Sequence, residues 1–376
     1  MKKAVLISCF DWYEKRLKPV RNSLLDKGYE VKVLLSDFNH TKKQRYNKFH
    51  EPCTYFHVPI YKKNISLKRI ISHFSFARQS KTYIEKYKPD IIYCLVPPNK
   101  VVDYCSSYKK RNPKVIFIID IIDMWPESMP TKRINGFPFV KQFMNHWMKW
   151  RDNAIKNADY VFTECNLYRE KLSHVLNPAK TATLYLFKEQ SDHERKLVLD
   201  IINRKKNDDV IRFAYIGSMN HIIDITSICR VIATIVNKGK RCELHAIGGG
   251  ESRKKFEREV KAIGCHTYFY GFVYDEIKKI SIIAPCDYAF NMMKSDISVG
   301  LTIKSIDYLS YGLPLINNIK GDTWQLIESE KIGVNIDDNT IINIPDEFQH
   351  HEIIKCYEQI FTKKAFTDII YRILNY

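Results

Sequence analysis

The sequence lacks an apolar run long enough to cross a membrane. Its longer runs, such as Val115–Ile119, fall far short of the roughly 18 residues that a spanning helix requires. After Met1 the chain enters a short strand-like run and not the apolar segment of a signal peptide, so we expect a protein of the cytoplasm. The ten cysteines are scattered and form no CxxC pair, which argues against structural zinc and indicates reduced thiols.

Internal repeats, low-complexity linkers and a completed GxGxxG fingerprint are also missing. No DxD stands in a context that favours metal binding, and we therefore expect neither a metal nor another cofactor. These absences exclude a repeat protein and give no support to a simple dinucleotide-binding enzyme.

The 376 residues suffice for about two domains, and a hydrophobic content of 45% is enough for two cores. The net charge of +18 is unevenly divided. Residues 1–200 hold 37 Lys and Arg against 20 Asp and Glu, a net of +17, whereas residues 201–376 hold 23 against 22. This asymmetry favours an anionic partner of the first half, such as a membrane surface or a phosphate-bearing lipid. A lysine-rich coding bias is the alternative.

Short apolar runs alternate with helical patterns in both halves, which predicts parallel sheets covered on both faces. The expected strands are Ala4–Ser8, Glu30–Ser36, Asp90–Val96, Lys114–Ile122, Ala158–Glu164, Ile211–Gly217, Cys242–Ile247, Thr267–Tyr270 and Asp287–Asn291. We expect an α/β protein of two Rossmann-like, doubly wound domains that face a central cleft, with ligands at the carboxyl ends of the strands. The expected domains are residues 1–200 and 201–350, followed by a C-terminal helix in 351–376 that packs back on the first domain.

Residues 298–317, SVGLTIKSIDYLSYGLPLIN, carry the strongest functional pattern. Gly300 leads into a predicted helix with Lys304 near its start, and Gly312-Leu313-Pro314 ends that helix before a buried strand. A helix N-terminus beside a lysine favours a pyrophosphate, because free amides and a fixed cation both attract anions. Asp307, one turn further along, is placed to accept hydrogen bonds from ribose hydroxyls.

Together with this segment, the motifs FAYIGSM (213–219), LHAIGGG (244–250), YGFVYDEI (270–277), IIDMWPES (121–128) and NADYVFTEC (157–165) resemble the GT-B glycosyltransferases, in particular the family 4 type of bacterial surface-polysaccharide synthesis. The resemblance covers most of the chain. It implies that the second domain binds a nucleotide-sugar donor, UDP- or GDP-linked, through residues in four turns: Gly217, Ser218, Gly248, Gly249, Gly271, Phe272, Val273, Gly300, Leu301, Thr302, Lys304, Ser305 and Asp307. Ordinary packing turns are the alternative for the glycines.

The chain departs from the family at one position. Asp307 stands where the family has the second glutamate of an E-x7-E pattern, but Val299 stands where the first is expected. Since that first acid normally contacts sugar hydroxyls, the donor sugar stays open.

For the acceptor side, polar residues that follow the buried strand 114–122 are the candidates. Asp123 is the first catalytic candidate, to position or deprotonate the attacking hydroxyl, and Glu127 is the second, with Lys304 acting on the donor. Asp123 as a turn cap is the alternative. The resemblance adds Asp11, Trp12 and Trp125 to the acceptor site.

Two basic, amphipathic stretches suit contact with anionic lipid, although an apolar stripe is also typical of core. The first has Leu67, Ile70, Ile71, Phe74 and Ala77 beside Lys62, Lys63, Lys68, Arg69, Arg78 and Lys81, and the second has Val140, Phe143, Met144 and Trp147 beside Arg133, Lys141 and Lys149.

We therefore expect a retaining glycosyltransferase, peripherally bound to the inner face of the cell membrane, that transfers a sugar to a lipid-linked or saccharide hydroxyl. A homodimer or a partner transferase is compatible with the sequence, and nucleic acid is not expected, because it would explain the charge but not the glycine turns. The alternatives are a catalytically silent scaffold subunit, suggested by Val299, and a nucleotide-sugar epimerase.

Overall fold

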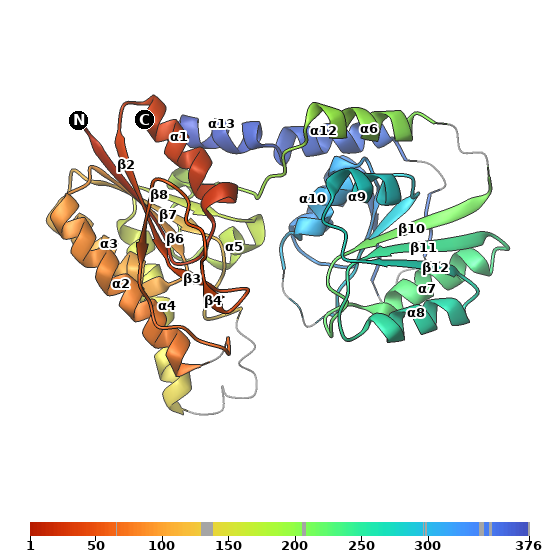
Figure 1. Cartoon of the computed structure of the whole chain (residues 1–376), viewed down its shortest axis with the longest axis horizontal. Coiled ribbons are helices and arrows are strands. Elements are labelled where there is room, and N and C mark those ends of the chain that lie inside the picture. Colours follow the sequence, from red (N-terminus) through yellow and green to blue (C-terminus); the bar gives the residue numbers. More distant parts are fainter. Residues whose placement is uncertain are drawn as a thin grey trace. The chain divides into compact units, whose positions relative to one another are not determined.

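In a computed structural model the chain forms two α/β units (Figure 1). The structure describes all residues except 65, 129–137, 205–207, 296, 298, 338–341, 346–347 and 375–376, and the side chains of 138–140. Unit 1 comprises Met1–Leu186 and Phe366–Tyr376, and unit 2 comprises Phe187–Ala365.

Unit 1 contains a parallel sheet of seven strands in the order β5-β2-β1-β6-β7-β8-β9. The strands are β1 (Lys3–Ser8), β2 (Glu30–Ser36), β5 (Cys53–Phe56), β6 (Ile91–Val96), β7 (Ile116–Ile121), β8 (Tyr160–Thr163) and β9 (Thr181–Thr183), and β3 (Phe38–Asn39) pairs with β4 (Gln44–Arg45) in a small antiparallel ribbon. The strand order reverses between β1 and β6. In doubly wound folds this reversal marks the place where ligands bind, at the carboxyl ends of the strands.

Helices cover both faces of this sheet (Figure 1). They are a π-helical turn (Tyr13–Leu17), α1 (Lys18–Asp26), α2 (Leu67–Tyr87), α3 (Asn99–Arg111), α4 (Pro138–Asn157), α5 (Asn166–Lys171) and a 3-10 turn (Pro178–Lys180). Helices α2, α3 and α4 pack on one face, while α1 and the end of α13 (Lys363–Leu374) pack on the other.

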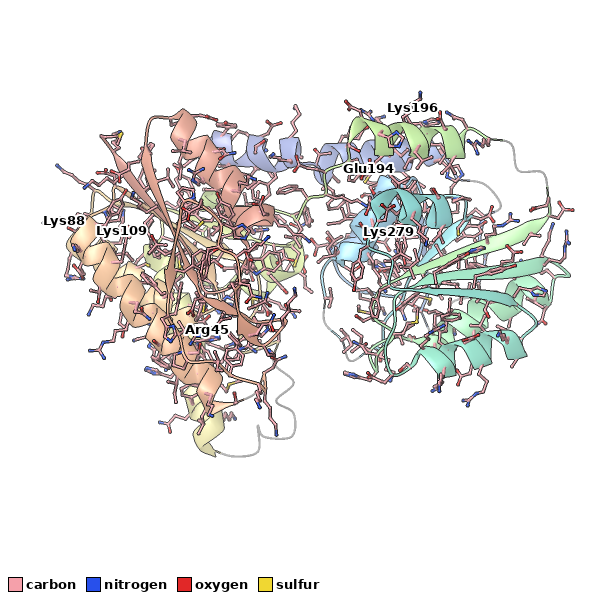
Figure 2. The ribbon with its side chains drawn as sticks, in the orientation of Figure 1. Arg45, Lys88, Lys109, Glu194, Lys196 and Lys279 are labelled. Carbon is pink, nitrogen blue, oxygen red and sulfur yellow. The ribbon has the colours of Figure 1, made fainter. Side chains whose placement is uncertain are left out.

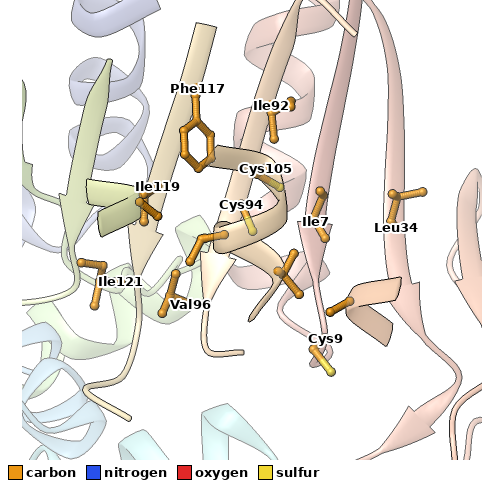
Figure 3. Close-up of a cluster of buried hydrophobic side chains, with 14 of the residues drawn as sticks. Ile7, Cys9, Leu34, Ile92, Cys94, Val96, Cys105, Phe117, Ile119 and Ile121 are labelled. Atoms are coloured by element: carbon orange, nitrogen blue, oxygen red, sulfur yellow. The ribbon is translucent and has the colours of Figure 1, made fainter. Parts of the chain in front are cut away.

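The core of unit 1 follows the two-residue period of a strand. In β7, Phe117, Ile119 and Ile121 point to one face, where they meet Cys94 of β6 and Cys105 of α3 (Figure 3). Every residue of β6 is buried, as expected for a central strand covered on both sides.

Unit 2 contains a parallel sheet of six strands in the order β12-β11-β10-β13-β14-β15. The strands are β10 (Val210–Ile216), β11 (Arg241–Ile247), β12 (His266–Gly271), β13 (Tyr288–Asn291), β14 (Leu315–Asn317) and β15 (Gly333–Asn335). The helices are α6 (Asp192–Ile202), α7 (Ile225–Val236), α8 (Arg253–Ala262), α9 (Glu276–Ile283), α10 (Ile303–Ser310), α11 (Asp322–Glu330) and α12 (His350–Ile360). The order reverses between β10 and β13. The two doubly wound sheets expected from the sequence are therefore confirmed.

Side-chain caps fix where several helices of unit 2 begin. The side chains of Asp224, Asp275 and Thr302 accept hydrogen bonds from the first turns of α7, α9 and α10. At the start of α6, Ser191 forms a reciprocal capping box with Glu194, which Figure 2 labels.

The division between the units lies upstream of the boundary expected at residue 200. Helix α6 belongs to unit 2, because Gln190 donates to the Ser310 carbonyl at 2.9 Å and Arg195 pairs with Glu358 at 2.5 Å. These long-range contacts leave no signal in the local sequence.

The single C-terminal helix expected within residues 351–376 is instead two helices, α12 and α13. The Phe361 carbonyl accepts the Lys188 amide at 2.9 Å, and the Thr362 hydroxyl accepts the Ala365 amide at 3.2 Å, so one helix ends and another is capped at this point. The end of α13 packs in unit 1, where Tyr371 donates to Asp26 at 2.9 Å. No helix within the described ranges is long and apolar enough to span a bilayer.

Candidate active site

Two glycine turns meet at the carboxyl ends of β10 and β11 in unit 2. The Gly217 amide donates to the Ile247 carbonyl at 3.0 Å, and the Met219 amide donates to the Gly249 carbonyl at 2.9 Å. The Ser218 amide, between them, has no acceptor in the described part of the chain. The structure thus brings Gly217, Ser218 and Gly249 together, and their role in binding a donor stays a prediction.

Close approach of the two backbones requires these glycines. A Cβ atom on Gly248 would lie 2.0 Å from the Gly217 oxygen, and one on Gly250 would lie 2.4 Å from the Met219 oxygen. Both glycines also have positive φ, 126° and 149°.

We expect Gly248→Ala to destabilise unit 2 by about 3 kcal/mol, because the new methyl group overlaps backbone and the left-handed φ strains it. Gly239→Ala is the matched control. Gly239 also has positive φ, 79°, but open space around its Cβ position, so only the smaller conformational cost of about 1 kcal/mol applies. Chemical denaturation of both variants measures the difference, and equal losses would show that the contact with Gly217 is unimportant.

Lys304 lies in the first turn of α10, beside these turns. Its ammonium is 5.0 Å from the centre of the Tyr215 ring, and the Tyr215 hydroxyl donates to the Ser218 carbonyl at 3.0 Å. Burial lowers the pKa of Lys304 to about 8. The Lys304 side chain is partly buried, and among the described residues no carboxylate pairs with it.

A ladder of buried amides holds the loop before α10. The Thr302 hydroxyl donates to Asn291 Oδ1 at 2.8 Å, Asn291 donates to Asn317 Oδ1 at 2.9 Å, and Asn317 donates to Asn335 Oδ1 at 2.8 Å. The three asparagines are paired in register at the ends of β13, β14 and β15. Satisfied buried networks of this kind are rigid, so the α10 N-terminus is held in place. Ser305 is buried in the same turn, and the Gly300 carbonyl accepts the Thr323 amide at 3.1 Å.

The Asp307 side chain contacts Lys188 and does not contact Lys304. Its carboxylate accepts from the Lys188 ammonium at 2.8 Å, and Glu276 accepts from the same ammonium at 2.6 Å. Lys279 (Figure 2) donates to Glu276 at 2.6 Å, and the pKa of Glu276 falls to about 2 because these cations outweigh the cost of burial, Lys188 most of all. The expected contact between Asp307 and a ribose stays a prediction.

The loop after β12 presents an aromatic surface. Phe272 is 67% exposed and stacks on Tyr274 at a ring separation of 6.3 Å. The Gly271 carbonyl accepts the Gly248 amide at 2.7 Å, so this loop adjoins the glycine turns. Val273 and Leu301 are partly exposed. Their place in the donor site stays a prediction.

In unit 1 the two predicted catalytic carboxylates differ. Burial raises the pKa of Asp123, which accepts from the Ser128 hydroxyl at 2.6 Å. Glu127 forms a bidentate ion pair with the buried Arg151, at 2.7 and 3.0 Å. Glu127 is thus tied to a structural partner, and Asp123 is the better placed of the two for chemistry.

The other predicted acceptor residues are distributed around the ends of β1 and β7. Asp11 is exposed and lies 3.3 Å from His50, and Trp12 precedes the π-helical turn. Trp125 is buried, and the Asn99 side chain donates to its carbonyl at 2.9 Å.

A buried ion pair that sequence reasoning missed lies between Arg16 and Asp120. The guanidinium donates through Nε and Nη2 to the two carboxylate oxygens, both at 2.6 Å, and the Tyr93 hydroxyl donates to the same carboxylate at 2.6 Å. Burial lowers the pKa of Arg16, but Asp120 more than offsets this and raises it. The Nη1 atom of Arg16 is buried and has no hydrogen-bond partner among the described residues.

Glu164, directly after β8, was also missed, although it stands in the quoted segment NADYVFTEC. Burial raises its pKa to about 7; Arg16 opposes the rise, and Asp120 and Asp123 add to it. No hydrogen bond to its carboxyl occurs among the described residues. A carboxyl with a pKa near neutrality beside Asp123 can exchange a proton at physiological pH.

We expect Glu164→Gln to stabilise unit 1 in a pH-dependent way. Below about pH 4.5 the carboxyl is protonated in both folded and unfolded chains, and it costs nothing. Between about 4.5 and 7 only the unfolded form ionises, so stability falls as pH rises, by about 3 kcal/mol in all. The variant should gain up to that amount at pH 8 and little at pH 4.5.

Denaturation followed by tryptophan fluorescence suits this test, because Trp12, Trp125, Trp147 and Trp150 lie in unit 1. Glu51→Gln, at an exposed position, is the control and should change stability by less than about 0.5 kcal/mol. A gain of the same size at both pH values would contradict the assigned pKa.

The two basic, amphipathic stretches are only partly exposed. The predicted contact with anionic lipid is therefore wrong for those of their residues that are buried. Leu67 and Ile71 are exposed, but Arg69, Ala77 and Trp147 are buried, because α2 and α4 pack on the sheet. Arg133 and the Val140 side chain lie outside the described residues.

Comparison with solved structures identifies the architecture. Sucrose-phosphate synthase from Thermosynechococcus elongatus matches with a TM-score of 0.65 at 12% identity, over 100% of this chain and 98% of that one. The lipopolysaccharide outer core galactosyltransferase WaaB gives 0.60 at 15% identity, over 99% of each chain. The Anabaena protein HepE (Alr3699), in complex with UDP and glucose, gives 0.59 at 12%, over all of both chains. The chain has the GT-B fold.

The expected GT-B architecture is therefore confirmed at the level of fold. No model of a known protein family matches the sequence, and neither does any curated protein. Within the described part of the chain, no three His, Cys, Asp or Glu side chains form a group that could hold a metal ion.

Proposed function

We propose that this chain is a glycosyltransferase that moves a sugar from a nucleoside diphosphate donor to a hydroxyl group of a lipid-linked or saccharide acceptor. The observation that carries this proposal is Lys304, a cation that no described carboxylate pairs with, held beside the glycine turns at the switch point of unit 2. The fold it shares with sucrose-phosphate synthase and WaaB supports the same reaction class.

In this proposal unit 2 stabilises the leaving diphosphate. The Lys304 ammonium, the Ser218 amide and the N-terminus of α10 supply positive charge where negative charge develops as the glycosidic bond breaks. The amide ladder behind Thr302 keeps these groups from reorganising during the reaction. The base would lie against Phe272, and UDP is the first nucleotide to test, since HepE was solved with it.

Unit 1 would position the acceptor hydroxyl near Asp123. We propose that the reaction retains the anomeric configuration, with the departing diphosphate taking the acceptor proton, so that orientation is the main task of unit 1. Because Lys304 can neutralise the diphosphate, we expect transfer to survive treatment with EDTA.

We further propose a role in bacterial surface-polysaccharide synthesis at the inner face of the membrane. The net charge of +17 in residues 1–200 and the exposed Leu67 and Ile71 support contact with anionic lipid. WaaB, which shares the fold, acts on lipopolysaccharide outer core.

The purified chain should be incubated with a panel of nucleotide sugars, with and without lipid-extracted or oligosaccharide acceptors, and the products read by NMR. A new glycoside with the donor's anomeric configuration is the expected result. An isomerised nucleotide sugar formed without acceptor would indicate an epimerase. Absence of both turnover and donor binding would indicate a silent subunit.

A further inference from the structure

Two basic side chains of unit 1, Arg69 and Lys43, lie against the ring of Tyr61. The guanidinium carbon of Arg69 is 5.5 Å from the ring centre, and the Lys43 ammonium is 5.0 Å from it. Burial lowers the pKa of Lys43, and the charge of Arg69 lowers it further. The fold thus holds two like charges close enough to disfavour each other.

Neither cation has a carboxylate partner among the described residues. Arg69 donates to the Asn64 carbonyl at 3.1 Å and lies 3.5 Å from His73 Nε2, while Lys43 donates to the Asn64 side-chain oxygen. Burial lowers the pKa of Arg69; Asp123 is near enough to oppose this, but its carboxylate is not within ion-pairing distance. Because charged side chains are seldom buried unless they are paired, this arrangement calls for an anion from elsewhere.

Aromatic rings and histidines, and no ion-paired carboxylate among the described residues, surround the two cations. Arg69 stacks over the Trp125 ring at 3.5 Å and lies 5.8 Å from that of Phe10. Burial, Arg69 and Lys43 lower the pKa of His40 to about 4, and burial and Arg69 also lower that of His73. His73 is therefore neutral, and its buried Nδ1 has no hydrogen-bond partner in the part of the chain that the structure describes.

The cluster lies where a ligand of unit 1 is expected. Phe10 follows β1 and Trp125 follows β7, so the cluster adjoins the carboxyl ends of the strands near the switch point. Arg69 is in the first turn of α2, where free amides reinforce the positive charge. Lys43 has a φ of 57°, a backbone conformation that residues other than glycine rarely adopt.

We propose that Arg69 and Lys43 bind a phosphate or diphosphate group carried by the acceptor. That an acceptor carries this phosphate rests on the proposed function, whereas the binding of phosphate by these two residues does not. Lys43 is partly exposed and would contact the anion directly. Arg69 is only 4% exposed and would attract the anion from the buried side of the cluster. A phosphate ester, with close to two negative charges at neutral pH, matches two cations better than a single carboxylate does.

Calorimetric titration with inorganic pyrophosphate tests this proposal in the Lys304→Met background, which removes the donor-site lysine. We expect saturable binding that Lys43→Met weakens about tenfold and that Arg69→Lys also weakens, because a lysine cannot reproduce the stacked, forked guanidinium. Lys42→Met, at the neighbouring exposed position, is the matched control and should leave the affinity unchanged. Glucuronate, a carboxylate, should bind more weakly than pyrophosphate.

Equal affinities of the Lys43 and Lys42 variants, absence of binding to the parent, or preference for glucuronate would each overturn the proposal. Phosphatidylcholine vesicles with added polyprenyl diphosphate, compared with vesicles containing phosphatidylglycerol, identify the source of the phosphate. Lys43-dependent retention on the former assigns a lipid-linked acceptor, and pyrophosphate binding without such retention assigns a water-soluble sugar phosphate. These readouts need no catalytic turnover, so a failure of the proposed transferase activity is distinguishable from a failure of this site.

Discussion

Replacing Lys304 by methionine is expected to weaken nucleoside diphosphate binding about 10- to 100-fold, the usual range for a hydrogen bond to a charged group. Methionine keeps much of the side chain's packing on Tyr215, so the loss reports on the charge. If transfer occurs, its rate should fall by about 10²- to 10³-fold, because Lys304 would act on charge that develops in the transition state. Calorimetry and initial rates measure the two effects.

The same lysine predicts a pH dependence. With a pKa of about 8 in the unliganded protein, most of the ammonium is charged at pH 7 and most is neutral at pH 9. Affinity for the diphosphate should therefore fall about tenfold between these values. The Lys304→Met variant should not show this fall, and Lys278→Met, at an exposed position on α9, should behave like the parent. A parent affinity independent of pH would contradict the role of Lys304.

Asp120→Asn is expected to cost unit 1 about 3–5 kcal/mol, because it leaves the guanidinium of Arg16 buried and uncompensated. Arg16 is fully buried, and one of its nitrogens already lacks a partner. Water therefore cannot replace the charge-paired hydrogen bonds to Asp120 that the substitution removes. Tryptophan fluorescence during urea denaturation reports on unit 1, which holds four of the five tryptophans.

The double variant Arg16→Met/Asp120→Asn separates charge burial from packing. An apolar replacement of a buried ion pair is often nearly neutral, so the double variant should recover much of the stability lost in Asp120→Asn. If the single variant loses less than about 1 kcal/mol, or if the second substitution adds to the loss, the account of this pair is wrong.

Local patterns in the sequence predicted the features that depend on local chemistry. The strand at Glu30–Ser36 was placed correctly at both ends, since a short run rich in valine and leucine after Gly28 favours a strand. Packing turns were the alternative stated for the glycines, and a Cβ on Gly248 would lie 2.0 Å from the Gly217 oxygen, so only glycine fits there. Lys304 was predicted near a helix start because Gly300 leads into that segment, and the structure shows Thr302 as the cap of this helix.

Residues whose role depends on distant partners were not predictable. Arg16 and Asp120 are 104 positions apart, and neither carries a motif. Arg69 was read as a solvated flank of an amphipathic helix, whereas the helix turns it inward onto Trp125. Glu164 looks like an ordinary residue after a strand, and only its burial beside Asp120 and Asp123 gives it a pKa near 7.

The central claim, that unit 2 binds a nucleoside diphosphate at Lys304, is tested most directly by a crystal structure of the chain with UDP or GDP. We predict diphosphate oxygens at about 3 Å from both the Lys304 ammonium and the Ser218 amide, with the base against Phe272. A diphosphate bound away from Lys304, with the glycine turns unoccupied, would contradict the claim.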